Sequence, residues 1–244
     1  MMLDRGLVLM SDTRTNSGVD NISSFRKMNH WSVPGERIVA IMTSGNLATT
    51  QAVISQLEER SKAPADRHNT LLEAPTMFQV ATAVGKLLRE TIQAREADNG
   101  QEAAGQFGAS MIIAGQIRGM EPRLFLIYPE GNFIEASFDT PFFQIGETKY
   151  GRPIILRGYE RSMSFEDAVK LLMVSFDSTL KANLSVGLPL DMLVIENNRF
   201  EPLHERRIDG SDTYFQSISA GWGEALRAAF QSLPAYSFEK AYQP

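Results

Sequence analysis

The predicted strands and helices of this chain come in blocks and do not alternate one by one. Apolar and β-branched runs predict strands, and apolar residues at helical spacing predict helices. Two strands are expected first, at residues 6–12 and 38–42, followed by two helices at 47–60 and 76–94. A group of strands comes next, at 111–117, 123–128, 133 onward and 142–145. Two more helices at about 152–182 and a strand at 190–195 follow. A doubly wound parallel sheet would place a helix after each strand, so this order favours antiparallel sheets covered by pairs of helices.

The composition is that of a folded protein. The chain has 244 residues, of which 43% are hydrophobic and 22% are charged. These values exclude a disordered or collagen-like chain, and the length fits one large domain or two small ones. A chain this long buries most of its apolar surface without the help of disulfides or metals.

Charge and cysteine content exclude several classes of function. The 24 Lys and Arg against 29 Asp and Glu give a net charge of −5. Since the sequence shows no basic cluster, we expect neither nucleic acid nor a membrane surface as a partner. The chain contains no cysteine, which excludes disulfides, thiolate metal sites and a cysteine nucleophile. No apolar run approaches the ~20 residues of a membrane span, and Asp4 and Arg5 interrupt any secretory signal, so a cytoplasmic location is expected.

The standard motif searches find no nucleotide-binding or hydrolase signature. The sequence has no P-loop, no dinucleotide-binding glycine fingerprint, no GxSxG and no HExxH. The three histidines, His30, His68 and His204, are far apart in sequence and are expected in different loops. We therefore expect no metal, no cofactor and no histidine base in a serine triad.

One group of residues combines an acid, a base and a glycine. Asp12 ends the first buried strand, Lys27 follows fifteen residues later on the next expected strand, and Gly45 stands at a strand-to-helix junction. A partly buried carboxylate–lysine pair can set the protonation of a nearby hydroxyl nucleophile, and the Gly45 N–H could act as an oxyanion donor at a helix start. The same residues could also form an ordinary cross-strand ion pair and a capping turn, which spacing alone favours.

Four sequence blocks resemble one family in the right order and over almost the whole chain. They are SDTRTNSGVD at residues 11–20, FRKM at 25–28, SGNLATTQAV at 44–53 and NLSVGLP at 183–189. These blocks resemble Anbu, the bacterial proteasome-type family related to proteasome β subunits and HslV.

The resemblance implies an N-terminal nucleophile (Ntn) hydrolase. The implied fold is α+β, a four-layer αββα sandwich of two antiparallel sheets flanked by helix pairs, in a single domain over residues 1–244 with a helical extension at about 211–244. In the family, a threonine at the start of the mature chain attacks an amide carbonyl, and its own α-amine accepts the proton. The resemblance thus implies a peptide or amide substrate and a homo-oligomer, either a ring or an open helical assembly. It leaves open whether an ATPase partner feeds it.

The resemblance also assigns roles to individual residues. Asp12 matches the aspartate that holds the lysine and the N-terminus, Lys27 the lysine that lowers the nucleophile's proton affinity, and Gly45 the oxyanion-hole glycine. Ser185 lies in the loop that supports the N-terminus. The chain departs from proteasome subunits in two places: Asn183 replaces an aspartate, and Gly146-Glu147-Thr148 replaces a Gly-Ser-Gly type turn, which leaves the roles of Glu147 and Thr148 open.

The largest departure concerns the nucleophile. Family members open with Met-Thr and a short strand that leads into a turn, whereas Met1 aligns just before that turn. Thr13 and Thr15 cannot replace the threonine because neither has a free α-amine.

Two explanations follow from this departure, and a third class of function stays open. The first explanation is an upstream start, which we favour because the turn and the Asp12–Lys27 pair are retained; it predicts an in-frame Met-Thr opening before Met1. The second is a catalytically inactive assembly subunit of the same fold. A small-molecule binding module fits the composition but explains none of the four blocks.

The aromatic tail at Tyr236, Phe238 and Tyr242 could pack on a neighbouring subunit or on the chain's own last helix.

Overall fold

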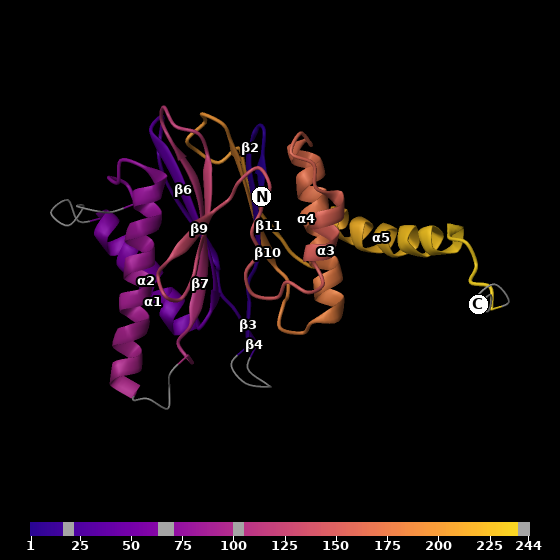
Figure 1. Cartoon of the computed structure of the whole chain (residues 1–244), viewed down its shortest axis with the longest axis horizontal. Coiled ribbons are helices and arrows are strands. Elements are labelled where there is room, and N and C mark those ends of the chain that lie inside the picture. The colour runs from indigo at the N-terminus through magenta and orange to yellow at the C-terminus, as the bar shows by residue number, and fades with distance from the viewer. Residues whose placement is uncertain (17–21, 63–70, 100–104, 239–244) are drawn as a thin grey trace, which may run out of the picture.

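The computed structural model describes residues 1–16, 22–62, 71–99 and 105–238. Two β-sheets face each other at the centre, and helices cover the outer face of each sheet (Figure 1). The predicted four-layer αββα sandwich is therefore confirmed. None of the helices in the described ranges combines the length and apolar character that a membrane span requires.

The first sheet has the strand order β1-β2-β10-β11, with every neighbouring pair antiparallel. Its strands are β1 (Met2–Leu3), β2 (Gly6–Asp12), β10 (Leu190–Glu196) and β11 (His204–Ile208). Both β2 and β10 lie inside the sheet and are apolar almost throughout, because both of their faces are buried. Strand β11 was not predicted; it is an edge strand whose first four residues are exposed and polar.

The second sheet has five antiparallel strands in sequence order. They are β5 (Met28–Val33), β6 (Arg37–Gly45), β7 (Ala109–Ile117), β8 (Arg123–Ile127) and β9 (Phe133–Glu135). Strands β3 (Arg14–Asn16) and β4 (Ile22–Ser24) pair in a small separate sheet. The strand expected at residues 142–145 is wrong: the segment forms no strand. Its apolar character instead reflects packing, because Phe142 is buried against the helices over the first sheet.

Helices α1 (Leu47–Lys62) and α2 (Met77–Asn99) cover the second sheet, and α3 (Arg152–Gly158) and α4 (Phe165–Ala182) cover the first. Helix α4 starts as its capping motif predicts, with Ser164 accepting a hydrogen bond from the backbone N–H of Asp167. Helix α2 runs five residues beyond its expected end at residue 94. Helix α5 (Thr213–Ser232) points away from the sandwich.

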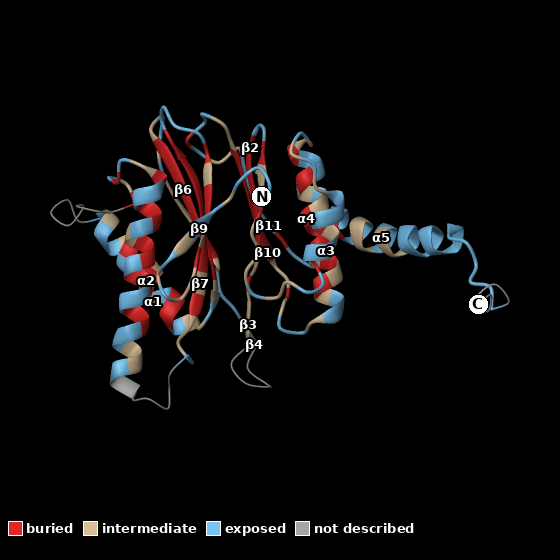
Figure 2. Ribbon diagram, in the orientation of Figure 1, coloured by how far each residue is buried: buried red, intermediate tan, exposed pale blue. Residues whose placement is uncertain are grey.

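Apolar side chains fill all three interfaces between the layers. In Figure 2 the buried residues gather along the strands of both sheets and on the helix faces toward them. Side chains alternate along β2: Leu7 and Leu9 contact the second sheet, whereas Val8 and Met10 contact α3 and α4. This alternation fixes the register of β2, and with it the place where Asp12 leaves the sheet.

Candidate active site

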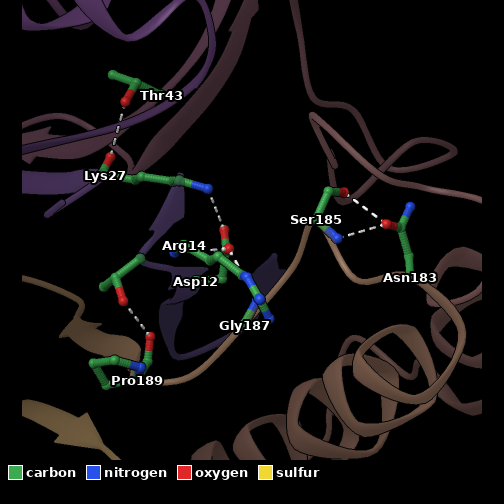
Figure 3. Close-up of polar contacts among 9 residues, drawn as sticks. Asp12, Arg14, Lys27, Thr43, Asn183, Ser185, Gly187 and Pro189 are labelled. Atoms are coloured by element: carbon green, nitrogen blue, oxygen red, sulfur yellow. Dashed lines mark hydrogen bonds and ion pairs between the residues drawn. The ribbon is translucent and has the colours of Figure 1, made fainter. Parts of the chain in front are cut away.

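Asp12 and Lys27 form an ion pair at one end of the space between the two sheets. The Lys27 Nζ lies 2.8 Å from Asp12 Oδ1, and the side chains are 22% and 12% exposed respectively (Figure 3). Asp12 is the last residue of β2. Lys27 was expected on a strand but lies immediately before β5. The pair therefore joins the first sheet to the second.

The other Asp12 oxygen fixes a third segment of the chain. Asp12 Oδ2 accepts hydrogen bonds from the backbone N–H of Arg14, at 3.1 Å, and of Gly187, at 3.3 Å. A second contact holds the same segment, since the Thr13 hydroxyl donates to the Pro189 carbonyl at 2.9 Å. The Asp12 carboxylate is thus held in one orientation by three donors from three parts of the chain.

Gly45 is the last residue of β6, where the backbone must pass close to a neighbouring chain segment. Its φ is +106°, and a Cβ at this position would lie 2.5 Å from the Gly108 carbonyl oxygen. Only glycine tolerates both conditions. Asn46 follows and caps α1, its Oδ1 accepting from the Thr49 N–H at 3.0 Å. Gly45 therefore stands directly before a helix N-terminus, as expected from the sequence.

Asn183 and Ser185 lie in the loop that follows α4 and form a hydrogen-bond chain with Glu147. The Ser185 hydroxyl and backbone N–H donate to Asn183 Oδ1 at 2.7 and 2.8 Å. Asn183 Nδ2 donates to Glu147 Oε2 at 2.6 Å. Two hydrogen bonds lower the pKa of Glu147: the larger effect comes from the backbone N–H of Lys149 and a smaller one from the Asn183 amide. Sequence reasoning left the role of Glu147 open, and the structure places it beside Asn183.

Two adjoining cavities meet at Lys27. One, of about 180 Å³, is lined by Met1, by β2 from Val8 to Asp12, and by Glu147 and Ser185 among others. The second, of about 570 Å³, is lined by polar residues such as Arg14 and Gln51 and includes Gly45. Lys27, Thr43, Ser44 and Ser185 line both.

The cavities bring together four of the five residues singled out from the sequence. Asp12, Lys27 and Ser185 line the first cavity, and Lys27, Gly45 and Ser185 line the second. Asn183 lines neither cavity and acts on Ser185 through its hydrogen bonds. Two histidines expected in loops are on strands, His30 on β5 and His204 on β11, and they line neither cavity. His68 lies outside the described residues.

The N-terminal end of the chain lies at the far end of the first cavity. The Met1 amine donates to the Val8 carbonyl at 2.9 Å, and the Val8 N–H donates back to the Met1 carbonyl at 3.0 Å. Burial lowers the pKa of this amine to about 5. The β1–β2 ladder continues with Met2 opposite Leu7 and Leu3 opposite Gly6.

The second cavity brings the Lys27 ammonium group and the Gly45 backbone together, two features that acyl-transfer chemistry can use. An ammonium group beside a cavity favours the ionised form of a hydroxyl nucleophile, and a backbone N–H at a helix start can stabilise an oxyanion. The model of the proteasome subunit family matches residues 1–195, so this chain belongs to that family.

Within this family the chain belongs to the Anbu, or ancestral β-subunit, group. The Yersinia bercovieri Anbu structure is 42% identical with a TM-score of 0.90, and the match covers 98% of each chain. Anbu from Hyphomicrobium sp. strain MC1 is 48% identical with a TM-score of 0.87, over 96% of this chain and 97% of that one. A structure described as the helical assembly of the Anbu complex from Pseudomonas aeruginosa is 41% identical with a TM-score of 0.90, over 100% and 98%. No curated protein matches the chain.

Proposed function

We propose that this protein is a threonine-type hydrolase subunit that cleaves peptide or amide bonds, with the nucleophile carried on an upstream continuation of β1. One observation carries the proposal: the first cavity follows one edge of β2 from the Met1 amine to the Asp12–Lys27 pair. Membership of the Anbu group supplies the expectation that the nucleophile is an N-terminal threonine.

The strand register gives the distance from Met1 to the pair. Met1 lies opposite Val8, so each preceding residue in the same antiparallel register would lie opposite the next residue of β2. The fourth residue before Met1 would then face Asp12 and the fifth Thr13. Four residues of strand span about 13 Å, at ~3.3 Å per residue. A chain end at that position would place an α-amine and a side-chain hydroxyl beside Lys27.

Each residue of the site then has a distinct role. The threonine hydroxyl attacks the carbonyl carbon, and its proton passes to the threonine α-amine. Lys27, held by Asp12, favours the alkoxide electrostatically, and the Gly45 N–H stabilises the oxyanion of the tetrahedral intermediate. Collapse expels the amine product, which takes the proton, and leaves an ester that water hydrolyses. Ser185, oriented by Asn183 and Glu147, offers a hydroxyl to the amine end of the nucleophile.

We also propose that the protein acts as a homo-oligomer in the cytoplasm. The Pseudomonas aeruginosa relative is described as a helical assembly, which supports an open assembly over a closed ring. The family match ends at residue 195, so we treat the chain as one catalytic domain with a helical extension at about 211–244.

The decisive comparison uses the natural protein, including whatever its gene encodes before Met1, and its Lys27→Met variant. We expect turnover of fluorogenic peptides or amides by the natural protein, and a loss of at least about 10³-fold in Lys27→Met. Lys86→Met is the matched control, because Lys86 lies on α2 with its side chain 67% exposed, and it should keep full activity. Equal turnover by Lys27→Met would refute the role of Lys27, whereas no covalent or catalytic reaction of the natural protein would favour the inactive assembly subunit.

A further inference from the structure

The second cavity lies between helix α1 and the β5 edge of the second sheet. Side chains alternate along β5: Met28 packs between the two sheets, whereas Trp31 contacts the core under α1 and α2. Asn29, two positions from Trp31, therefore lines the cavity from the sheet side. The α1 residues at the cavity recur at helical spacing, so they form one face of the helix. They are Leu47, Thr50, Gln51, Ile54 and Ser55.

The charged residues that line this cavity are all basic. They are Arg14, Arg26 and Lys27, and no Asp or Glu among the described residues lines it. Two of the three have an acidic partner outside the cavity: Lys27 lies 2.8 Å from Asp12, and Arg26 lies 3.5 Å from Glu205. Arg14 forms no ion pair within the described ranges. The cavity thus has an excess of positive charge.

Two polar atoms at the cavity are buried without a hydrogen-bond partner among the described residues. They are Arg14 Nε and Thr15 Oγ1, both on β3. The Arg14 side chain lies against Gly187, where an added Cβ would be 2.5 Å from Arg14 Cδ (Figure 3), so the loop after α4 holds its stem in place. Buried donors without a partner are rare because each one destabilises the fold. A ligand group rich in oxygen would satisfy both atoms.

We propose that the second cavity is a specificity pocket for an acidic side chain, carried by the residue whose carbonyl group is attacked. The inference rests on the hydrolase function proposed above, since Lys27 and Gly45 line the same cavity and place the reacting carbonyl at its edge. A glutamate or aspartate carboxylate accepts hydrogen bonds from the Arg14 guanidinium and the Thr15 hydroxyl.

Other side chains fit this lining less well. The amide groups of Asn29 and Gln51 add two further donors for a carboxylate. A lysine or arginine side chain would meet like charges and find no carboxylate, and a leucine side chain would leave the buried donors unpaired. A glutamine side chain could accept the same hydrogen bonds but gains nothing from the positive charge.

The first test compares four substrates with the natural protein, including whatever its gene encodes before Met1. They are fluorogenic peptide amides that differ only in the residue before the cleaved bond, which is Glu, Gln, Leu or Lys. We expect kcat/KM for the Glu substrate to exceed that for the Leu and Lys substrates by at least about a hundredfold, and that for the Gln substrate to lie between them.

The second test reverses the charge of the cavity. Gln51→Glu places a carboxylate on the α1 wall, and we expect it to lower the ratio of Glu to Lys turnover by at least about a hundredfold. Gln56→Glu is the matched control, because Gln56 is an exposed residue of the same helix that does not line the cavity, and it should keep the wild-type ratio. Asn29→Asp tests the opposite wall and should lower the ratio in the same way. A ratio measured within one variant does not depend on the folded fraction of the sample.

The outcomes separate this inference from the function on which it rests. Turnover that favours the Gln, Leu or Lys substrate would overturn the acidic specificity and leave the hydrolase standing. An unchanged ratio in both Gln51→Glu and Asn29→Asp would show that the side chain binds elsewhere and would likewise overturn the inference alone. A natural protein that turns over none of the four substrates would count against the hydrolase and the inference together.

Discussion

A polypeptide produced from Met1 should lose stability as the pH falls, because its N-terminal amine is buried. Within the described part of the chain the amine has one hydrogen-bond acceptor, the Val8 carbonyl, and burial lowers its pKa from the 8.0 of a free amine to about 5. Acetylation replaces the amine by an uncharged amide that can make the same hydrogen bond. The comparison therefore isolates one ionisable group.

The sign and size follow from proton linkage. Above about pH 8 the amine is neutral in both the folded and unfolded states, so its burial does not make the free energy of unfolding depend on pH. Between about pH 8 and pH 5 the unfolded chain binds the proton and the folded chain does not. The free energy of unfolding therefore decreases as the pH is lowered through this range. A difference of about three pKa units corresponds to roughly 4 kcal/mol. For a protein of this size that is a fall of about 8–16 °C in Tm.

Urea unfolding at several pH values between 5 and 8 measures the effect. The difference between the acetylated chain and the free-amine chain should be near zero at pH 8 and approach roughly 4 kcal/mol at pH 5. Two curves that stay parallel across this range would refute the buried position of the amine, and with it the register that leads from Met1 to Asp12.

Three further substitutions test the packing and the site. Gly45→Ala should lower the free energy of unfolding by at least about 2 kcal/mol, because a Cβ meets the Gly108 carbonyl oxygen at a positive φ; a wild-type urea midpoint would contradict this. Phe125→Ala should cost about 3–5 kcal/mol, since Phe125 is fully buried, and calorimetry would measure the loss. Glu147→Gln should destabilise the protein at neutral pH but not in acid. The pKa of Glu147 is lowered, so the ionised carboxylate stabilises the fold above the usual glutamate pKa, and this stabilisation is lost as the pH falls below it. The gap between the unfolding midpoints of wild type and Glu147→Gln should therefore narrow in acid, and a constant gap would count against the contact with Asn183.

The layered fold and the central ion pair could be predicted from sequence for local reasons. The apolar run from Gly6 to Met10 marks a strand buried on both faces, and Asp12 is the first charged residue after it. Both helix pairs follow from apolar spacing, and Ser164 marks the start of α4.

The features that sequence reasoning missed depend on tertiary contacts. Strand β11 has an exposed, charged surface. It pairs with β10 through its backbone and through the ion pair of Arg207 with Asp191, so no apolar side-chain pattern marks it. Phe142 packs against the helices over the first sheet. The apolar character that this packing requires made its segment resemble a strand. Glu147 and Asn183 are 36 residues apart and meet only because α3 and α4 bring their loops together.

The most direct measurement is the N-terminal residue of the natural protein after reaction with an acylating β-lactone. We predict a mature chain that begins with threonine four or five residues before Met1, with the acyl group on that threonine's hydroxyl, as read by mass spectrometry of the N-terminal peptide. We also predict that Lys27→Met prevents the labelling. An N-terminal peptide that begins at Met1, or an acyl group on any other residue, would contradict the assignment of a threonine nucleophile beside Asp12 and Lys27.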